Sequence, residues 1–564
     1  MSPIENLLGP CYDRGWYLLE CKAITETRSS SPHRWSQRGI LGGTNTIVAL
    51  YQPTHHRGMT ERKLDLLSRE THTDNERERM NNNTLISNAN KTITILSASM
   101  LEDLAMSKEA MDFNKQLSEV LYLRAVVQFA IVEVSTTLKA MMCAKTPYAK
   151  RYHYKNLIAS TSECYKMLYH FDTIRKHSIW CRFRNIVERR GTSEQQQKYA
   201  EIINSLNIFG NTQINKNMRD VVEHYSNDML YVYRVTVSLN SEDEAAKYYC
   251  CFTEILCKMH NLVTEIKEVI CSGEDGIIGN DNLHVNQDLL KIPLCKATIS
   301  NDNLKKTVDY ILDNAPRDLD LIADTEIRLK NFIERIEKSA NELQLSVGDD
   351  LFCEIQVPVK ISTIQMLLRM MFNDIMAVCE AIFTSINTFE ASLHLRRLVI
   401  HETAMMSLLY GYEEKDGIIP IWRSLETDIP TKLFEQKKQI DKLLQTLNSL
   451  VNRDKRHAYV HIYEKNGQVI FDSFIAEIEK LDFDYEFSLT SIIALLYGKM
   501  MEFLSNLMQE ISIEKHRETE ESSRKLLSMF DSILEFIQKA PMDDILKKQR
   551  LEQMNNLKQM LATL

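Results

Sequence analysis

The sequence contains few of the signatures that would assign it to a metal, redox or membrane protein. None of its 12 cysteines pairs with another in a Cys-x-x-Cys spacing, which excludes zinc knuckles and thioredoxin-like redox sites. No basic segment precedes an apolar stretch at the N-terminus, and no run of about 18 uncharged apolar residues occurs, so we expect neither secretion nor membrane spanning. The cysteines lie mostly in apolar helical stretches, which suits reduced thiols in the cytoplasm.

Nucleotide-binding and hydrolase motifs are missing as well. No Walker loop, GxGxxG, GxSxG or HExxH pattern occurs, so NTPase, dinucleotide-binding, serine-hydrolase and zinc-protease interpretations have no support. Lys and Arg number 68 against 77 Asp and Glu, and the resulting net charge of −9 disfavours a protein-wide RNA cradle. We expect no metal, no cofactor and only local contacts to nucleic acid.

What is present is an ordinary globular composition, with 44% hydrophobic and 26% charged residues. The head of the chain differs, because residues 1–58 hold six of the 16 glycines and four of the 11 prolines without hydrophobic periodicity. We expect an irregular or disordered segment over residues 1–91. A second interpretation of residues 1–58 stays open, namely upstream sequence translated with the protein, with Met59 as the alternative start.

Helical patterns fill the rest of the chain and predict an all-α fold. The segments 120–142 and 363–383 are apolar on most faces, which is typical of buried helices. Further helices are expected at about 154–172, 195–206 and 243–272, before a Gly/Asn/Asp-rich stretch. The predicted organisation is a first domain at 92–272, a linker at 273–325, a second domain at 326–512 and an amphipathic helical appendage at 513–564, packed on the body or on a partner.

The two domains show the pattern of a diverged duplication. Three positions in the first domain recur 241 residues later: Leu157, Leu168 and Tyr169 match Leu398, Leu409 and Tyr410. Outside the head of the chain, the only two tryptophans occur as Ile179-Trp180 and Ile421-Trp422. Two copies of one helical fold are the simplest explanation.

One short motif follows each Ile-Trp pair. Arg219 to His224 is RDVVEH, and Arg456 to His461 is RHAYVH, so both fit R-[NDH]-x-x-x-H. The looser spacing R-x-x-x-x-H also occurs at Arg28–His33 and Arg396–His401, where no Asn, Asp or His follows the arginine. Only the polar position separates the two candidate sites from chance spacing. Glu163 and Glu402 lie two positions out of register on the corresponding early helices and are not predicted to be catalytic.

The motif resembles the signature of the HEPN family, helical-bundle domains whose catalytic members are metal-independent ribonucleases. The resemblance covers about 92–272 and 326–512. HEPN ribonucleases dimerise so that two motifs face each other across a two-fold axis. For this chain the resemblance therefore implies tandem HEPN-like bundles that form an internal pseudo-dimer, with one composite site built from both motifs.

The motif chemistry suits RNA cleavage. On a helix the polar residue and the histidine form an i,i+4 pair, so Asp220 can orient His224, and His457 can orient His461. Imidazole titrates near neutral pH and can take the proton from a 2′-hydroxyl. The arginine guanidinium can stabilise the negative charge that gathers on the phosphate oxygens. The predicted catalytic residues are Arg219, Asp220, His224, Arg456, His457 and His461.

Two further patterns lie near the motifs. The runs around Asn466-Gly467 predict a β-hairpin after the second motif, and the β-rich Tyr231–Leu239 predicts another after the first. Four arginines gather between Cys181 and Arg190, which fits either an RNA-backbone patch or an ordinary exposed helical face.

The favoured prediction is a cytoplasmic endoribonuclease that leaves a 2′,3′-cyclic phosphate and a 5′-hydroxyl and acts as a toxin or antiphage (antiviral defence) effector. RNA is the expected substrate, and a regulatory protein or nucleic-acid partner and a homodimer stay open. One alternative is an RNA-guided nuclease similar to type VI CRISPR effectors, although the chain is short and its charge of −9 disfavours a stably held guide RNA. The other alternative is a non-catalytic helical interaction protein.

Overall fold

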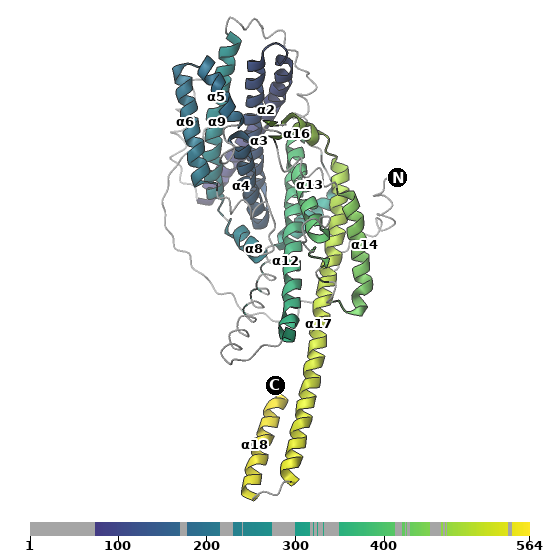
Figure 1. The fold of residues 1–564 in the computed structure, drawn as a ribbon. Helices are drawn as coiled ribbons and strands as arrows, with labels where there is room; N and C mark the ends of the chain where they lie inside the picture. Colours follow the sequence, from purple (N-terminus) through teal and green to yellow (C-terminus); the bar gives the residue numbers. More distant parts are fainter. Residues whose placement is uncertain are drawn as a thin grey trace. The chain divides into compact units, whose positions relative to one another are not determined.

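Helices make up nearly all the regular structure that a computed structural model of the chain describes (Figure 1). The description covers residues 74–563 apart from the ranges 170–177, 215–228, 240, 273–298, 300, 316–319, 321–323, 325–326, 328–330, 332–348, 412–419, 424, 426–428, 452–463, 466–467, 470 and 540–543. Within these residues the all-α prediction is confirmed. The single sheet described is the antiparallel pair β1 (Glu464–Lys465) and β2 (Gln468–Val469).

The first half is organised around a helix that is buried on nearly every face. The helices, in chain order, are α2 (Asp74–Ala110), α3 (Lys115–Cys143), α4 (Pro147–Tyr169), α5 (Ile179–Arg190), α6 (Ser193–Thr212), α8 (Met229–Ser238) and α9 (Glu242–Ser272). The central helix α3 contacts α2, α4, α5 and α9, which explains its apolar composition on all faces. Asn114 caps α3 by accepting a hydrogen bond from the Leu117 backbone N–H, and Thr192 and Gln195 form a capping box that starts α6.

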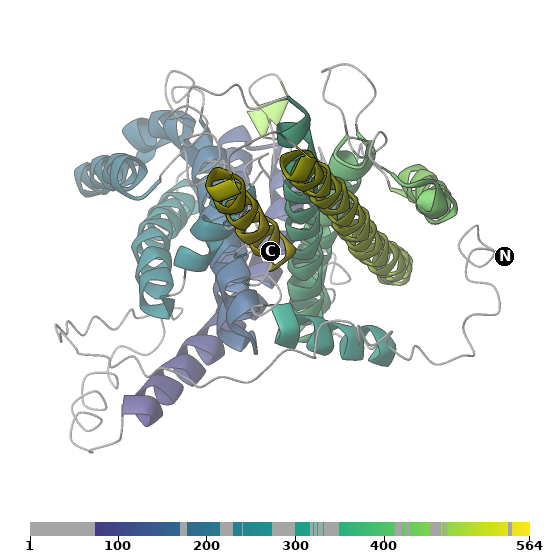
Figure 2. The same ribbon diagram turned by 90° about the horizontal axis from the view of Figure 1, so that it is seen from below.

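The second half is also built of helices. They are α12 (Asp349–Phe383), α13 (Thr388–Tyr410), the 3₁₀ turn η5 (Thr431–Leu433), α14 (Phe434–Leu450), α16 (Phe471–Glu479), α17 (Phe483–Lys539) and α18 (Asp544–Thr563). The side chain of Asn387 caps α13, which ends before Gly411 because that residue takes a φ of +89°. Helix α18 packs along the C-terminal part of α17, as Figure 1 shows from the side; Figure 2 gives the view of both helices from below.

The helices of the two halves are related by the same offset of 241 residues as the matched side chains. Helix α4 spans Pro147–Tyr169 and α13 spans Thr388–Tyr410, so both bounds of α13 follow those of α4 by this offset. The start of α14 follows the start of α6 by the same offset, and the start of α17 follows the start of α9 by it. The ends of α8 and α16 are related in the same way. The repeat suggested by a few matched side chains therefore extends to the order and register of the helices.

Several predicted boundaries differ from the structure. The segment 231–239 is not a hairpin, because it belongs to α8, where Val232 and Thr236 are buried. Tertiary packing has overridden its β propensity. Helix α2 begins at Asp74, inside the segment predicted to be irregular, and residues 302–315 of the predicted linker are helical. Helix α17 runs without a break through the predicted boundary at 512.

One described helix segment, Phe483–Glu514, is long and apolar enough to cross a membrane by length and composition, and half of it is buried against other helices. This segment is the part of α17 that contacts α12, α13 and α14. Packing in the protein core accounts for the apolar character of its buried half.

Candidate functional site

The six predicted catalytic residues, Arg219, Asp220, His224, Arg456, His457 and His461, all lie outside the residues that the structure describes. Their positions relative to the helices can still be compared along the sequence. Arg219 follows the end of α6 by seven residues, and Arg456 follows the end of α14 by six. Because α6 and α14 are repeat counterparts, the two motifs occupy the same interhelical connection in the two halves.

The helix after each motif packs against the opposite half. Helix α8, which follows the first motif, contacts α12 of the second half as well as its neighbour α4. Helix α16, which follows the second motif, contacts α13 of its own half and also α3 of the first half. There Phe471 and Phe474 lie against Phe129, with ring centroids 5.1 and 5.4 Å apart, and the Phe471 backbone N–H donates to Tyr122. The two connections that carry the motifs are thus each anchored to the other copy.

Buried ion pairs join the halves between these two contacts. Glu133 on α3 accepts hydrogen bonds from Arg396 and Arg397 on α13, each at 2.6 Å. Burial acts to raise the pKa of Glu133, but the two guanidinium groups outweigh it and hold the pKa below its ordinary value. On the other side, Asp374 on α12 accepts from Lys155 on α4 at 3.0 Å.

The repeat relates these two ion pairs. Asp374 is the repeat counterpart of Glu133, and Arg396 is the counterpart of Lys155. An acid on α3 therefore binds a base on α13, while the equivalent acid on α12 binds the equivalent base on α4. All four side chains are buried, so this cluster holds the halves together and is closed to a substrate.

The loosely spaced pair Arg396–His401 has a structural role in this core. Arg396 is engaged with Glu133, and the His401 ring nitrogen forms a 2.7 Å hydrogen bond with the Tyr152 hydroxyl. The two side chains of this R-x-x-x-x-H spacing thus contact different partners in the first half.

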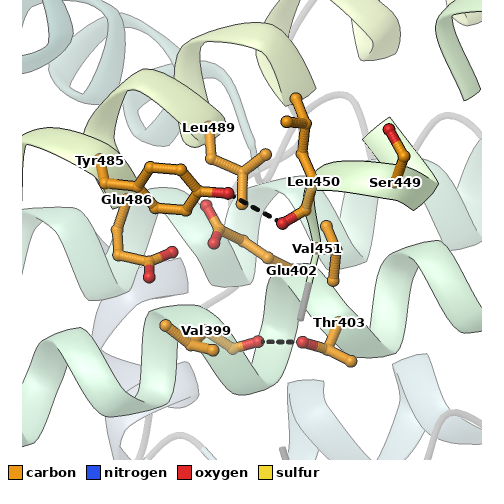
Figure 3. Close-up of a pocket in the computed structure, with 9 residues that line it drawn as sticks. All are labelled: Val399, Glu402, Thr403, Ser449, Leu450, Val451, Tyr485, Glu486 and Leu489. Atoms are coloured by element: carbon orange, nitrogen blue, oxygen red, sulfur yellow. Dashed lines mark hydrogen bonds between the residues drawn. The ribbon is translucent and has the colours of Figure 1, made fainter. Parts of the chain in front are cut away.

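An open cavity of about 280 Å³ lies in the second half, where α13, the end of α14 and the start of α17 meet (Figure 3). Its lining residues are Val399, Glu402, Thr403, Ser449, Leu450, Val451, Tyr485, Glu486 and Leu489. Arg456 follows the lining residue Val451 by five residues in the sequence. The cavity therefore borders the start of the connection that carries the second motif.

Two buried carboxyl groups face this cavity. Glu402 is fully buried, and its Oε1 accepts a hydrogen bond from the Thr490 hydroxyl at 2.6 Å. Its carboxyl group also hydrogen-bonds the carboxyl group of Glu486. Burial, and next the neighbouring carboxylate of Glu486, raise the pKa of Glu402 well above its ordinary value. Sequence reasoning set Glu402 aside and missed Glu486, because only the packing of α17 on α13 brings the two together.

The arginines of α5 form an exposed basic face. Arg182, Arg184, Arg189 and Arg190 are exposed, whereas Ile179, Trp180, Phe183, Ile186 and Val187 on the other side of the helix are buried. Glu188 pairs with Arg184 at 2.7 Å and compensates part of this charge, while Arg190 donates to the neutral amide oxygen of Gln116. Among the described residues, no group of three or more His, Cys, Asp and Glu side chains could hold a metal ion.

No family model, no curated protein and no solved structure matches this chain.

Proposed function

We propose that this protein is a metal-independent endoribonuclease of the HEPN type, with a composite site formed by both R-x-x-x-x-H motifs. The observation that carries the proposal is the position of the motifs. Both motifs lie in the same interhelical connection of a repeat whose helices keep one constant offset between the halves. Two polar R-[DH]-x-x-x-H motifs in the same connection, four residues out of register with the helices, are hard to reconcile with chance spacing.

The contacts between the halves support a shared site. Helix α8 packs on the second half and α16 on the first, so each motif connection ends at a helix held by the other copy. The exposed arginines of α5 add a local surface for phosphate contacts.

The proposed mechanism divides the chemistry between the two motifs. One histidine removes the proton of the 2′-hydroxyl, whose oxygen attacks the adjacent phosphorus. As the bond from phosphorus to the 5′-oxygen breaks, the other histidine gives a proton to that oxygen, which leaves a 2′,3′-cyclic phosphate and a 5′-hydroxyl. Arg219 and Arg456 stabilise the charge on the non-bridging oxygens, while Asp220 and His457 orient the histidines.

The test is incubation of the purified full-length protein with structured and unstructured RNA in EDTA, followed by analysis of the product ends. Cleavage that leaves cyclic phosphates supports the proposal, whereas intact RNA with a folded protein would favour a non-catalytic helical interaction protein. A high ratio of absorbance at 260 nm to that at 280 nm in the purified protein would instead indicate bound RNA and favour an RNA-guided nuclease.

The proposed biological setting is that of a cytoplasmic toxin or antiphage effector. RNA is the substrate in this proposal, and a regulatory protein or nucleic acid would switch the activity on.

A further inference from the structure

The last part of α17 extends beyond the repeat. Helix α9 ends at Ser272, whose repeat counterpart is Ile513, whereas α17 continues for about 40 Å past that point. Helix α18 packs back along this extension, and an ion pair between Asp531 and Lys558 joins the two helices (Figure 1). Residues 514–539 of α17 and the whole of α18 thus form a two-helix arm added to the second half.

The α17 side of the arm carries two apolar seams. Apolar residues spaced alternately three and four positions apart lie along one side of a helix and form the contact with a neighbouring helix. The first seam is half-buried or buried, as expected of the side that α18 covers, and consists of Leu527, Phe530, Leu534 and Ile537. The second seam lies beside it and consists of Met529, Ile533 and Phe536, with relative exposures of 60%, 41% and 70%. The two-helix arm therefore leaves this second seam, here called the open seam, in contact with solvent.

The charge of the arm favours a protein partner over an anionic surface. The sequence 514–564 contains nine Asp and Glu and nine Lys and Arg, so the arm is neutral although the whole chain carries −9. The pairs Glu521–Lys525 and Glu535–Lys539 lie on α17 beside the open seam. A lipid or nucleic-acid partner of negative charge would be matched by an excess of cations. An apolar seam flanked by paired charges is typical of helices that pack against other helices.

The charges are divided between the two helices of the arm in a way that suits a second copy. Among the described residues, α17 from residue 527 onward has a net charge of −1, from Asp531, Glu535 and Lys539. Helix α18 has a net charge of +2, from Asp544, Glu552, Lys547, Lys548, Arg550 and Lys558. If two arms pack face to face around a two-fold axis that runs along them, each α17 lies beside the α18 of the other copy. The attraction between α17 and α18 within one chain is then repeated twice between the chains.

We propose that the arm is a dimerisation surface, which pairs with the arm of a second copy of this chain to form a four-helix bundle. The open seam of each α17 is covered by α18 of the other copy, so Met529, Ile533 and Phe536 become buried. Both copies of the repeat domain lie at the same end of the bundle. The proposal does not depend on the proposed ribonuclease activity, because the arm contains neither motif.

The experiment is sedimentation equilibrium of the purified full-length protein over a range of concentrations. The wild type should form a dimer. Phe536→Glu places a charge in the open seam of both copies and should weaken dimerisation about 100-fold, tenfold for each copy. Met529→Lys should do the same with the opposite charge. Met111→Glu is the matched control, because Met111 is 66% exposed on the connection between α2 and α3, and this variant should dimerise like the wild type.

A measurement of folding separates a lost interface from a damaged protein. Because Phe536 and Met529 are exposed, both variants should keep the helix content and the cooperative unfolding of the wild type, measured by circular dichroism at a concentration where the wild type is monomeric. A wild type that stays monomeric at every concentration, or a dimer that both variants leave intact, would overturn the proposal. Binding of a monomeric wild type to phosphatidylserine vesicles, lost in Phe536→Glu, would overturn it in favour of a lipid surface.

Discussion

The imidazole rings of His153 and His394 lie 6.5 Å apart in the core, centroid to centroid, and each residue is the repeat counterpart of the other. In an isologous contact between two copies, a residue near the axis meets its own counterpart, and each ion pair occurs twice with the roles of the copies reversed. These histidines and the ion pairs beside them follow this pattern. The same contact makes the core sensitive to acid.

We expect the protein to lose stability below pH 6.5 because of these histidines. Burial, and next the charge of Arg397, lower the pKa of His153 to about 3, and burial with Arg397 also lowers that of His394. A histidine whose pKa is lowered in the folded state stabilises the fold above its unfolded pKa, and this contribution is lost as the pH falls through the window between the two values. Between pH 6.5 and 5, each unit fall in pH should raise the unfolding constant of the wild type by about ten times more than that of His153→Gln, because the variant takes up one proton fewer on unfolding. Urea denaturation at several pH values measures the slope, and an unchanged slope would show that His153 is not buried in its neutral form.

Removing the acid at one ion pair should destabilise the contact between the halves. Glu133→Gln leaves Arg396 and Arg397 buried without a counter-charge, and we expect a loss of about 3–5 kcal/mol. Glu254→Gln, which breaks the exposed pair with Lys258 on α9, serves as the control and should change little. Denaturation midpoints measure both, and similar values for the two variants would contradict the role given to Glu133.

A composite catalytic site predicts that each histidine is needed. His224→Ala and His461→Ala should each reduce RNA cleavage by about 10²- to 10⁴-fold, and the double variant should fall little further. EDTA should leave the wild type active, since HEPN-type cleavage uses no metal. Rates with a defined RNA substrate measure the effect. If each single variant instead kept about half the activity, the two motifs would be independent sites.

The buried carboxyl pair predicts a variant that is more stable than the wild type. A glutamate with a raised pKa stabilises the fold at low pH, and this contribution is lost as the pH rises through its folded pKa. Glu402→Gln should therefore raise the melting temperature at pH 8 and show a smaller difference at pH 5. Thr490 can still donate to the amide oxygen of the glutamine. A lower melting temperature at pH 8 would mean that Glu402 already has a cationic partner.

The helices were the most predictable part of the molecule. The apolar segments 120–142 and 363–383 lie within α3 and α12, and the pattern at 243–272 matches α9 to within one residue at its start. Long helices with strong periodicity leave little room for alternatives. Matched pairs such as Tyr169 and Tyr410, each the last residue of its helix, were enough to indicate the repeat.

Tertiary contacts were much less predictable. The β-branched run 231–239 became α8 because its buried face packs on α4 and α12, which no local pattern encodes. The pairing of Glu402 with Glu486 depends on two helices that are far apart in the chain. For the six motif residues, the prediction from sequence stands without a structural test.

The exchanged ion pairs also bear on the origin of the chain. In these two exchanged pairs each half contributes one acid and one base: Glu133 and Lys155 from the first, Asp374 and Arg396 from the second. Two identical copies of either half, arranged in the same way, would therefore present opposite charges to each other at both contacts. This arrangement of charges suits an ancestor that formed a symmetric homodimer. Duplication would then have joined two copies in one polypeptide. The copies have since diverged, because the carboxyl pair Glu402 and Glu486 of the second half is replaced by Thr161 and Ala245 in the first.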